Sequence, residues 1–197
     1  MLQFSVKTDV DRVVRQIDAR FQRQVPFATA KALTATAQDV QKAITAELPI
    51  VFDRPTPFTL RAVAIAMATK ASLRSRVFLR DIQREYLQLQ IVGGVRTPKK
   101  RALVMPAGVA LNSFGNIPRN KIKQLLARKD VFSGNVRGIG GIWQRTSDGR
   151  LKLLIAYEPQ ARYERIFPLG LIAQRTIERR LIPNLRASLE RAIASAR

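Results

Sequence analysis

The spacing of apolar residues predicts two helices near the start of the chain. Residues 3–7 alternate between polar and apolar, which suits a short strand, and residues 10–21 then carry an apolar stripe at helical spacing. A second helix is expected to begin at Pro26, where a missing backbone N–H does no harm, and to end at Pro49. Its stripe is rich in alanine, which favours close packing against a neighbouring element.

Later residues predict two hairpins and a long final helix. Alternation over 60–69 and 73–80 indicates the first hairpin, and residues 142–155, with Asp148-Gly149 at the turn, indicate the second. Phe167-Pro168 precedes a helical stripe that extends almost to the end of the chain, with a kink or break expected at Pro183. A short helix is also expected from Asp81 to Leu89. Together these elements predict an α+β fold, with two N-terminal helices and a long C-terminal helix on one antiparallel sheet of hairpins.

Residues 93–141 have a different composition, with many glycines, several prolines and two basic clusters. A short helix is expected at 120–129. For the remainder the sequence favours an extended basic arm that becomes ordered on assembly, and a solvated insertion is the alternative. We therefore predict a single domain over 1–197 that carries this arm.

Charge points to an anionic partner. The chain has 35 lysines and arginines against 14 acidic residues, which gives a formal net charge of +21. Such an excess indicates binding to nucleic acid or to acidic protein faces, and charge alone does not separate these two. The basic residues are spread along the chain, which argues against sequence-specific DNA recognition through one helix.

The available side chains argue against an enzyme. Cysteine and histidine are absent, which excludes disulfides, thiolate catalysis, ordinary zinc sites and imidazole chemistry. The nearest acidic pairs, Asp9 with Asp11 and Asp81 with Glu85, are best interpreted as helix charges. We expect no catalytic residue, no metal and no cofactor. The sequence also lacks an apolar run of membrane-spanning length and a signal-like start, so we expect a soluble chain made in a cytoplasm.

The stretch Phe-Asp-Arg-Pro-Thr-Pro-Phe-Thr at 52–59 is the leading candidate for an interaction segment. Its two prolines force an extended path with few backbone donors, so it is either a stiff connector or a docking loop. Trp143 is interpreted first as a sheet-packing residue and second as a docking contact. The candidate docking residues are Phe52, Arg54, Pro55, Pro57, Phe58 and Trp143. The candidate contacts to phosphate or to acidic partners are Arg96, Lys99, Lys100, Arg101, Arg119, Lys121 and Lys123.

The order of these features resembles a known family. The resemblance rests on Arg23-Gln24-Val25-Pro26-Phe27-Ala28, Glu47-Leu48-Pro49, the stretch at 52–59, residues 93–99 and 102–106, Gly141-Ile142-Trp143 and the arginine-rich last helix. In this order the chain resembles the minor tail protein Z family of tailed bacteriophages and prophages. The resemblance covers nearly the whole chain, and the stretch at 52–59 is its most specific part.

The resemblance implies a structural role in the virion. Members are tail-completion proteins at the head-proximal end of long tails, assembled in the bacterial host cytoplasm, and they act as rings, commonly hexamers. The implied partners are the tail terminator, the tail tube and the head-closure or connector proteins, with possible non-specific contact to packaged DNA and none to membrane. The family offers no catalytic residues to carry over. Two alternatives stay open: a tail terminator or head-closure neck protein, and a non-specific architectural DNA-binding protein.

Overall fold

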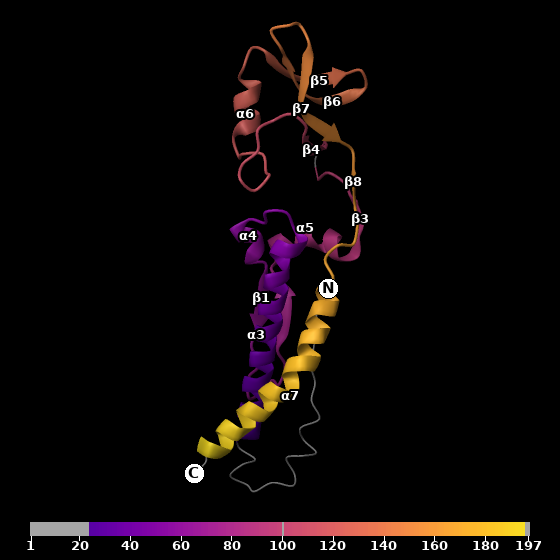
Figure 1. Ribbon diagram of the computed structural model, residues 1–197. Helices are drawn as coiled ribbons and strands as arrows, with labels where there is room; N and C mark the ends of the chain where they lie inside the picture. The colour runs from indigo at the N-terminus through magenta and orange to yellow at the C-terminus, as the bar shows by residue number, and fades with distance from the viewer. Residues whose placement is uncertain (1–23, 100, 196–197) are drawn as a thin grey trace. The chain divides into compact units, whose positions relative to one another are not determined.

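The computed structural model describes residues 24–99 and 101–195 (Figure 1). These residues form helices and antiparallel sheets, which confirms the predicted α+β class. They divide into two compact units: unit 1 contains residues 24–87 and 167–195, and unit 2 is Gln88–Ile166. The predicted strand at 3–7 and the predicted first helix lie outside the described residues.

Unit 1 is built on helix α3, Val25–Val51. Small and aliphatic residues at helical spacing are buried along it, as its stripe predicts: Ala28, Ala32, Leu33, Ala37, Val40, Ile44 and Leu48. The predicted end at Pro49 is wrong, because this proline lies inside the last turn. A proline so close to the end removes only one helical hydrogen bond, and the Phe52 N–H still donates to Leu48 O at 3.0 Å.

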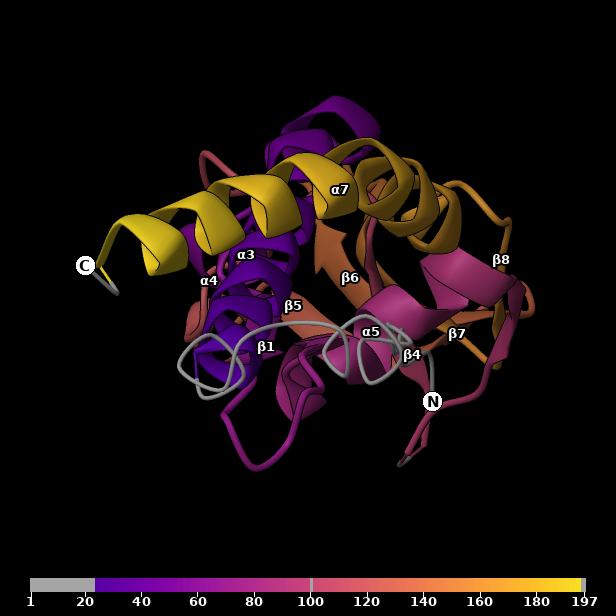
Figure 2. The ribbon, with the colours of Figure 1, turned by 90° about the horizontal axis from the view of Figure 1, so that it is seen from below.

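The long C-terminal helix α7, Leu169–Ser195, packs against α3 and runs in the opposite direction (Figures 1 and 2). The rings of Phe52 and Phe167 meet edge to face at one end of this pair, with centroids 5.5 Å apart. At the other end the Ser195 hydroxyl lies 3.4 Å from Gln24 Oε1. A kink or a break is predicted at Pro183; the helix continues through this residue, so a break does not occur.

A polar cluster ties the two helices together at mid-length. Arg180 Nε and Asn184 Nδ2 each donate to Asp39 Oδ2 at 2.9 Å, and Asn184 Nδ2 also reaches Thr36 Oγ1 at 3.1 Å. Burial disfavours the charge on Asp39, but the hydrogen bonds from Asn184 and Arg180 outweigh that effect. The pKa of Asp39 is therefore lowered from its ordinary value of 3.8.

The first predicted hairpin is confirmed and belongs to unit 1. Strands β1, Val63–Ala66, and β2, Arg76–Leu79, pair antiparallel. Side chains of α3 bind this hairpin: Gln41 Nε2 donates to Val63 O at 2.8 Å, and Thr34 Oγ1 accepts from the Ala68 N–H at 3.1 Å. Two shorter helices flank it, α4 at Pro57–Leu60 and α5 at Asp81–Val92. The last of these begins at the predicted residue and extends three residues beyond Leu89.

Unit 2 contains a four-stranded antiparallel sheet in the order β4-β7-β6-β5. The strands are β4 Leu103–Pro106, β5 Val131–Val136, β6 Ile139–Arg145 and β7 Leu151–Glu158. A separate pair joins β3, Gly94–Arg96, to β8, Ala161–Tyr163. Helix α6, Lys121–Leu126, lies inside the predicted range 120–129 and contributes to the core. That core consists of Leu125, Val131, Ile142, Leu154 and Ile155.

Two predictions about organisation differ from this structure. Residues 93–141 form strands β3 to β5, helix α6 and the start of β6, rather than an extended arm, because apolar residues dispersed along them meet in one core. The two predicted hairpins also do not share a sheet: β1–β2 belongs to unit 1 and β6–β7 to unit 2. Instead of one sheet covered by helices, the principal partner of α3 is α7.

A register shift shapes the centre of the unit 2 sheet. Ile142 faces Ile155 but Trp143 faces Leu153, so Leu154 is an extra residue on β7. This bulge lets two consecutive residues of β7, Leu154 and Ile155, both be buried. Gly141 sits beside it, where an added Cβ would come within 2.3 Å of Ile155 O. Only glycine allows the strands this close approach.

Candidate interaction surfaces

The segment at 52–58 is held firmly at both ends. Its first residue, Phe52, packs on Phe167, as described above. At the other end Thr56 caps α4 by accepting from the Thr59 N–H at 3.2 Å, and the Thr59 hydroxyl is 3.1 Å from Tyr86 Oη in α5. These contacts fix the path of the segment within unit 1.

Arg54 lies at the bend of this segment in a conformation that side chains rarely adopt, with φ of 45°. A non-glycine residue in the left-handed region is strained by about 1–2 kcal/mol and persists only where its surroundings hold it. Its guanidinium pairs with Asp53 at 2.9 Å, and this hydrogen bond lowers the pKa of the exposed Asp53 carboxyl. The bend thus presents an arginine to solvent at a fixed place.

Large apolar side chains of α4 and α5 are exposed in the same unit. Phe58 is 49% exposed and Ile82, at the start of α5, is 68% exposed. Gln83 Nε2 donates to Phe58 O at 3.2 Å, which joins the two elements that carry these side chains. We call Arg54, Pro57, Phe58 and Ile82 the α4 surface. Of the remaining predicted docking residues, Phe52 and Pro55 are half-buried in the support beneath it.

Trp143 belongs to the sheet of unit 2 rather than to a surface. It lies opposite Phe132 of β5 and is only 8% exposed. This placement agrees with the sheet-packing interpretation. The indole ring of Trp143 is not accessible for the docking contact that was the second interpretation. Its Nε1 has no hydrogen-bond partner among the described residues.

The basic residues proposed as phosphate contacts lie in unit 2. Arg96 is on β3, and Lys121 and Lys123 are on α6, which Figure 1 shows on the opposite side of the unit from β3. The two clusters therefore do not converge on one site. The side chains of Arg96, Lys99, Arg101, Arg119 and Lys123 are exposed, Lys121 is half-buried, and Lys100 lies outside the described residues.

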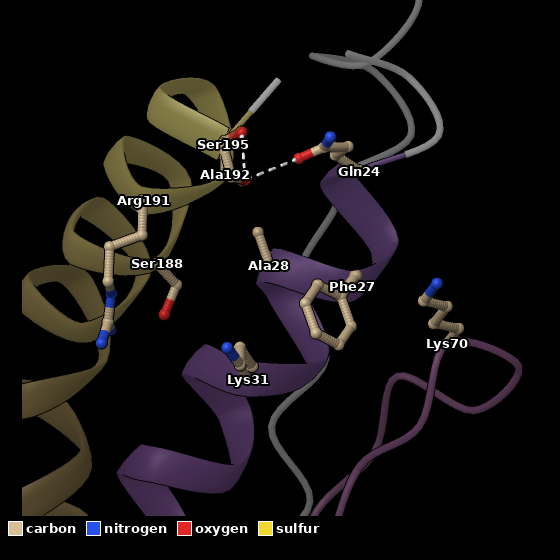
Figure 3. Close-up of a pocket in the computed structure, with 9 residues that line it drawn as sticks. All are labelled: Gln24, Phe27, Ala28, Lys31, Lys70, Ser188, Arg191, Ala192 and Ser195. Atoms are coloured by element: carbon tan, nitrogen blue, oxygen red, sulfur yellow. Dashed lines mark hydrogen bonds between the residues drawn. The ribbon is translucent and has the colours of Figure 1, made fainter. Parts of the chain in front are cut away.

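A pocket in unit 1 was not predicted. It has a volume of about 490 Å³ and lies between the first turns of α3, the last turns of α7 and the turn after β1 (Figure 3). A second hollow of about 500 Å³ shares Phe27, Lys31, Lys70 and Arg191 with it. We call the two together the Phe27 pocket. Gln24, at the start of α3, and Ser188, on α7, also line the first hollow.

The Phe27 pocket is strongly positive. The Nζ atoms of Lys31 and Lys70 lie 4.9 and 5.0 Å from the centroid of the Phe27 ring, which is 42% exposed. Arg191 donates from Nε to Ala187 O at 2.9 Å, and within the described chain its terminal nitrogens bind nothing. No acidic side chain of residues 24–99 or 101–195 lines the pocket.

Ser188 is the unusual polar group in this pocket. Its residue is 3% exposed, and its Oγ has no hydrogen-bond partner in the described part of the chain. Figure 3 shows the side chain on the side of α7 that faces α3. Burying a hydroxyl without a partner costs roughly 1–3 kcal/mol, so such groups usually have an unobserved partner.

This pocket could not be predicted from the sequence, because its residues come from three segments far apart in the chain. The one local signal was a pair of serines, Ser188 and Ser195, at positions that face the alanine-rich start of α3. The described residues hold no cluster of three or more acidic side chains that would suit a metal ion. Within the same residues, no helix combines the length and apolar character that crossing a membrane requires.

Comparisons with known proteins yielded no relative. No family model, curated protein or solved structure matches this chain.

Proposed function

We propose that this chain is a structural protein of a tailed bacteriophage that completes the head-proximal end of the tail and supports head–tail joining as a ring-forming subunit. The α4 surface is the observation that carries this proposal. Three of its four residues, Arg54, Pro57 and Phe58, lie in the stretch at 52–59, the most specific part of the resemblance to the minor tail protein Z family. They place an arginine and an aromatic ring in solvent on a fixed backbone.

Physical reasons make the α4 surface suitable for docking. Aromatic side chains and arginines are enriched at interfaces, where a few such anchors supply most of the binding energy. Phe58 and Ile82 expose apolar area that a partner would remove from water. Because prolines and the contacts of Phe52 and Thr59 already fix the segment, little ordering entropy is lost on binding.

The excess of positive charge favours anionic neighbours in such an assembly. The net charge of +21 would be offset by acidic faces of the terminator, tube or connector proteins, or by packaged DNA. The same charge supports the rival function, a non-specific architectural DNA-binding protein, because exposed lysines and arginines on separate faces of unit 2 suit contacts to phosphates without base reading.

Electron microscopy of lysates from a phage or prophage that lacks this gene tests the proposal. Filled heads and tails of normal length that accumulate unjoined, or tails with a malformed upper end, are the expected result. Particles that join normally would contradict it. Complete loss of tails would instead indicate an earlier role in tube or initiator assembly, and the position of the protein in assembled particles separates tail completion from a terminator or head-closure role.

Duplex binding by the isolated protein tests the DNA-binding rival. An architectural binder would lose affinity steeply as salt rises, because each neutralised phosphate releases counterions. For a tail-completion subunit whose cations face proteins, we expect no binding to duplex DNA at physiological salt.

A further inference from the structure

We infer that the Phe27 pocket is a binding site for a phosphomonoester group. This inference rests on the pocket alone and stands independently of the proposed role in the tail. Lys31, Lys70 and Arg191 bring three positive charges to one hollow, and no carboxylate of the described residues neutralises them there. A phosphomonoester carries close to two negative charges at neutral pH and three strong acceptor oxygens, which matches this set better than a single carboxylate does.

The buried Ser188 hydroxyl supplies the second, independent observation. It lines the pocket, is 3% exposed and has no partner among the described residues. A phosphate oxygen in the pocket would accept its hydrogen bond and remove the cost of an unsatisfied buried group. Neither lysine pairs with a carboxylate of the described chain, and each lies over the Phe27 ring. Figure 3 shows them on opposite sides of that ring, so Lys31, on the side of Ser188 and Arg191, is the lysine placed to contact the phosphate, and Lys70 adds positive potential from the other side.

The start of α3 adds to the positive potential. The helix is 27 residues long, and its first turn contains no acidic residue. Gln24 precedes it without forming a side-chain cap, so backbone N–H groups and the positive end of the helix dipole lie at the pocket. The C-terminal end of α7 has the opposite polarity, and its last turn contains no basic residue; Arg191 lies just before that turn.

The size of the pocket indicates that the ligand is more than inorganic phosphate. Each of its two hollows, at about 490 and 500 Å³, lies within the range of roughly 300–1,000 Å³ that is typical of small-molecule sites. The organic part of the ester would occupy the hollow beyond Ser188, along the half-exposed Phe27 ring. The ligand class is therefore a phosphate ester whose terminal group is anchored by the cations.

Calorimetric and ³¹P NMR titrations of the full chain test this inference. The probes are inorganic phosphate, adenosine 5′-monophosphate, adenosine, and a short oligonucleotide with either a 5′-phosphate or a 5′-hydroxyl. We expect saturable binding only of inorganic phosphate and of the probes that carry a terminal phosphomonoester, and not of adenosine or of the 5′-hydroxyl oligonucleotide. Tighter binding of the mononucleotide than of the oligonucleotide identifies a small-molecule site, and the reverse order identifies a nucleic-acid end as the source of the phosphate.

Substitutions separate the pocket from general charge. Lys31→Gln should weaken binding about tenfold, whereas Lys42→Gln, the same change on the same helix, should change it less than about twofold. The two lysines are 11 positions apart, roughly 16 Å along the helix axis, which is beyond the Debye length of about 8 Å at physiological salt. Ser188→Ala should weaken binding about tenfold and leave the melting temperature of the free protein unchanged or higher, because it removes an unsatisfied buried group.

Three results would overturn the inference. Absence of saturable binding by every phosphate-bearing probe is the first, and equal weakening by Lys31→Gln and Lys42→Gln is the second. The third is capture of an acidic peptide, weakened by Ser188→Ala and Lys31→Gln, when no phosphate probe binds. That result would assign the pocket to a protein partner.

Discussion

The two units of this molecule are stabilised in different ways. In unit 1 the core extends along α3 and α7, where alanines such as Ala28, Ala32, Ala173 and Ala192 let the two helices approach closely. In unit 2 five aliphatic residues from one helix and three strands form the central cluster. Unit 1 therefore distributes its stability over many small contacts, while unit 2 depends on a few large side chains and on exact strand spacing.

Removing one large side chain from unit 2 should have the largest effect on stability. Ile155→Ala empties a fully buried position in the central strand β7 and should cost about 2–5 kcal/mol. Hydrogen exchange should accelerate in amides of 103–158 and much less in α3 and α7. Equal acceleration in both units would contradict their having separate cores.

Substitution of Gly141 tests whether the close spacing of β6 and β7 requires a glycine. Gly141→Ala places a Cβ within 2.3 Å of Ile155 O and should destabilise the protein by about 1–3 kcal/mol in denaturant titration. Gly138→Asn is the matched control, because that glycine has nothing within 4 Å and asparagine tolerates its φ of 83°. If both substitutions lower the free energy of unfolding by the same amount, the close approach of the strands does not explain the need for glycine at position 141.

The polar cluster of unit 1 should contribute less. Asp39→Asn should cost about 1 kcal/mol or less, because Arg180 is 46% exposed and solvent screens the pair. The lowered pKa of Asp39 gives a stability increment that is present above its ordinary pKa of 3.8 and is lost as pH falls through the lower folded value. Acid titration of unfolding should show this loss in the native protein. If Asp39→Asn leaves the pH dependence of the unfolding free energy the same as in the unsubstituted protein, Asp39 is not the group that causes the loss.

The α4 surface should contribute least to folding. Phe58→Asp changes a half-exposed side chain and should alter the free energy of unfolding by less than about 0.5 kcal/mol. Denaturant titration measures this directly. A loss of several kcal/mol would mean that Phe58 is part of the core and would remove it from the list of docking residues.

Unit 1 was largely predictable because its signals are local. The 3.6-residue spacing in α3 and α7 and the alternation in β1 and β2 can each be seen within one segment. The prediction that α3 ends at Pro49 is wrong because a proline in the final turn costs one hydrogen bond, whereas the burial of Leu48 favours the helical conformation there. Tertiary contacts outweighed the local preference.

Unit 2 was less predictable: its β6–β7 hairpin was expected from local alternation, but its other strands lack a local signature. Strand β5 contains serine, glycine and asparagine, and its turn to β6 uses Arg137-Gly138. Both residues have positive φ, as a type I′ hairpin turn requires, but arginine is not a residue that predicts such a turn. Two prolines identified the stretch at 52–59 in advance. The Phe27 pocket, in contrast, exists only after α3, α7 and the β1–β2 turn come together.

Complementation of a phage lacking this gene tests the docking role of the α4 surface most directly. The double variant Phe58→Asp/Ile82→Asp should fold but fail to restore joined particles, as counted by electron microscopy. The control Ile139→Asp, which alters a side chain 48% exposed against 49% for Phe58, should restore them. If the double variant yields joined particles as efficiently as the wild-type protein, the α4 surface is not where this protein meets its neighbours.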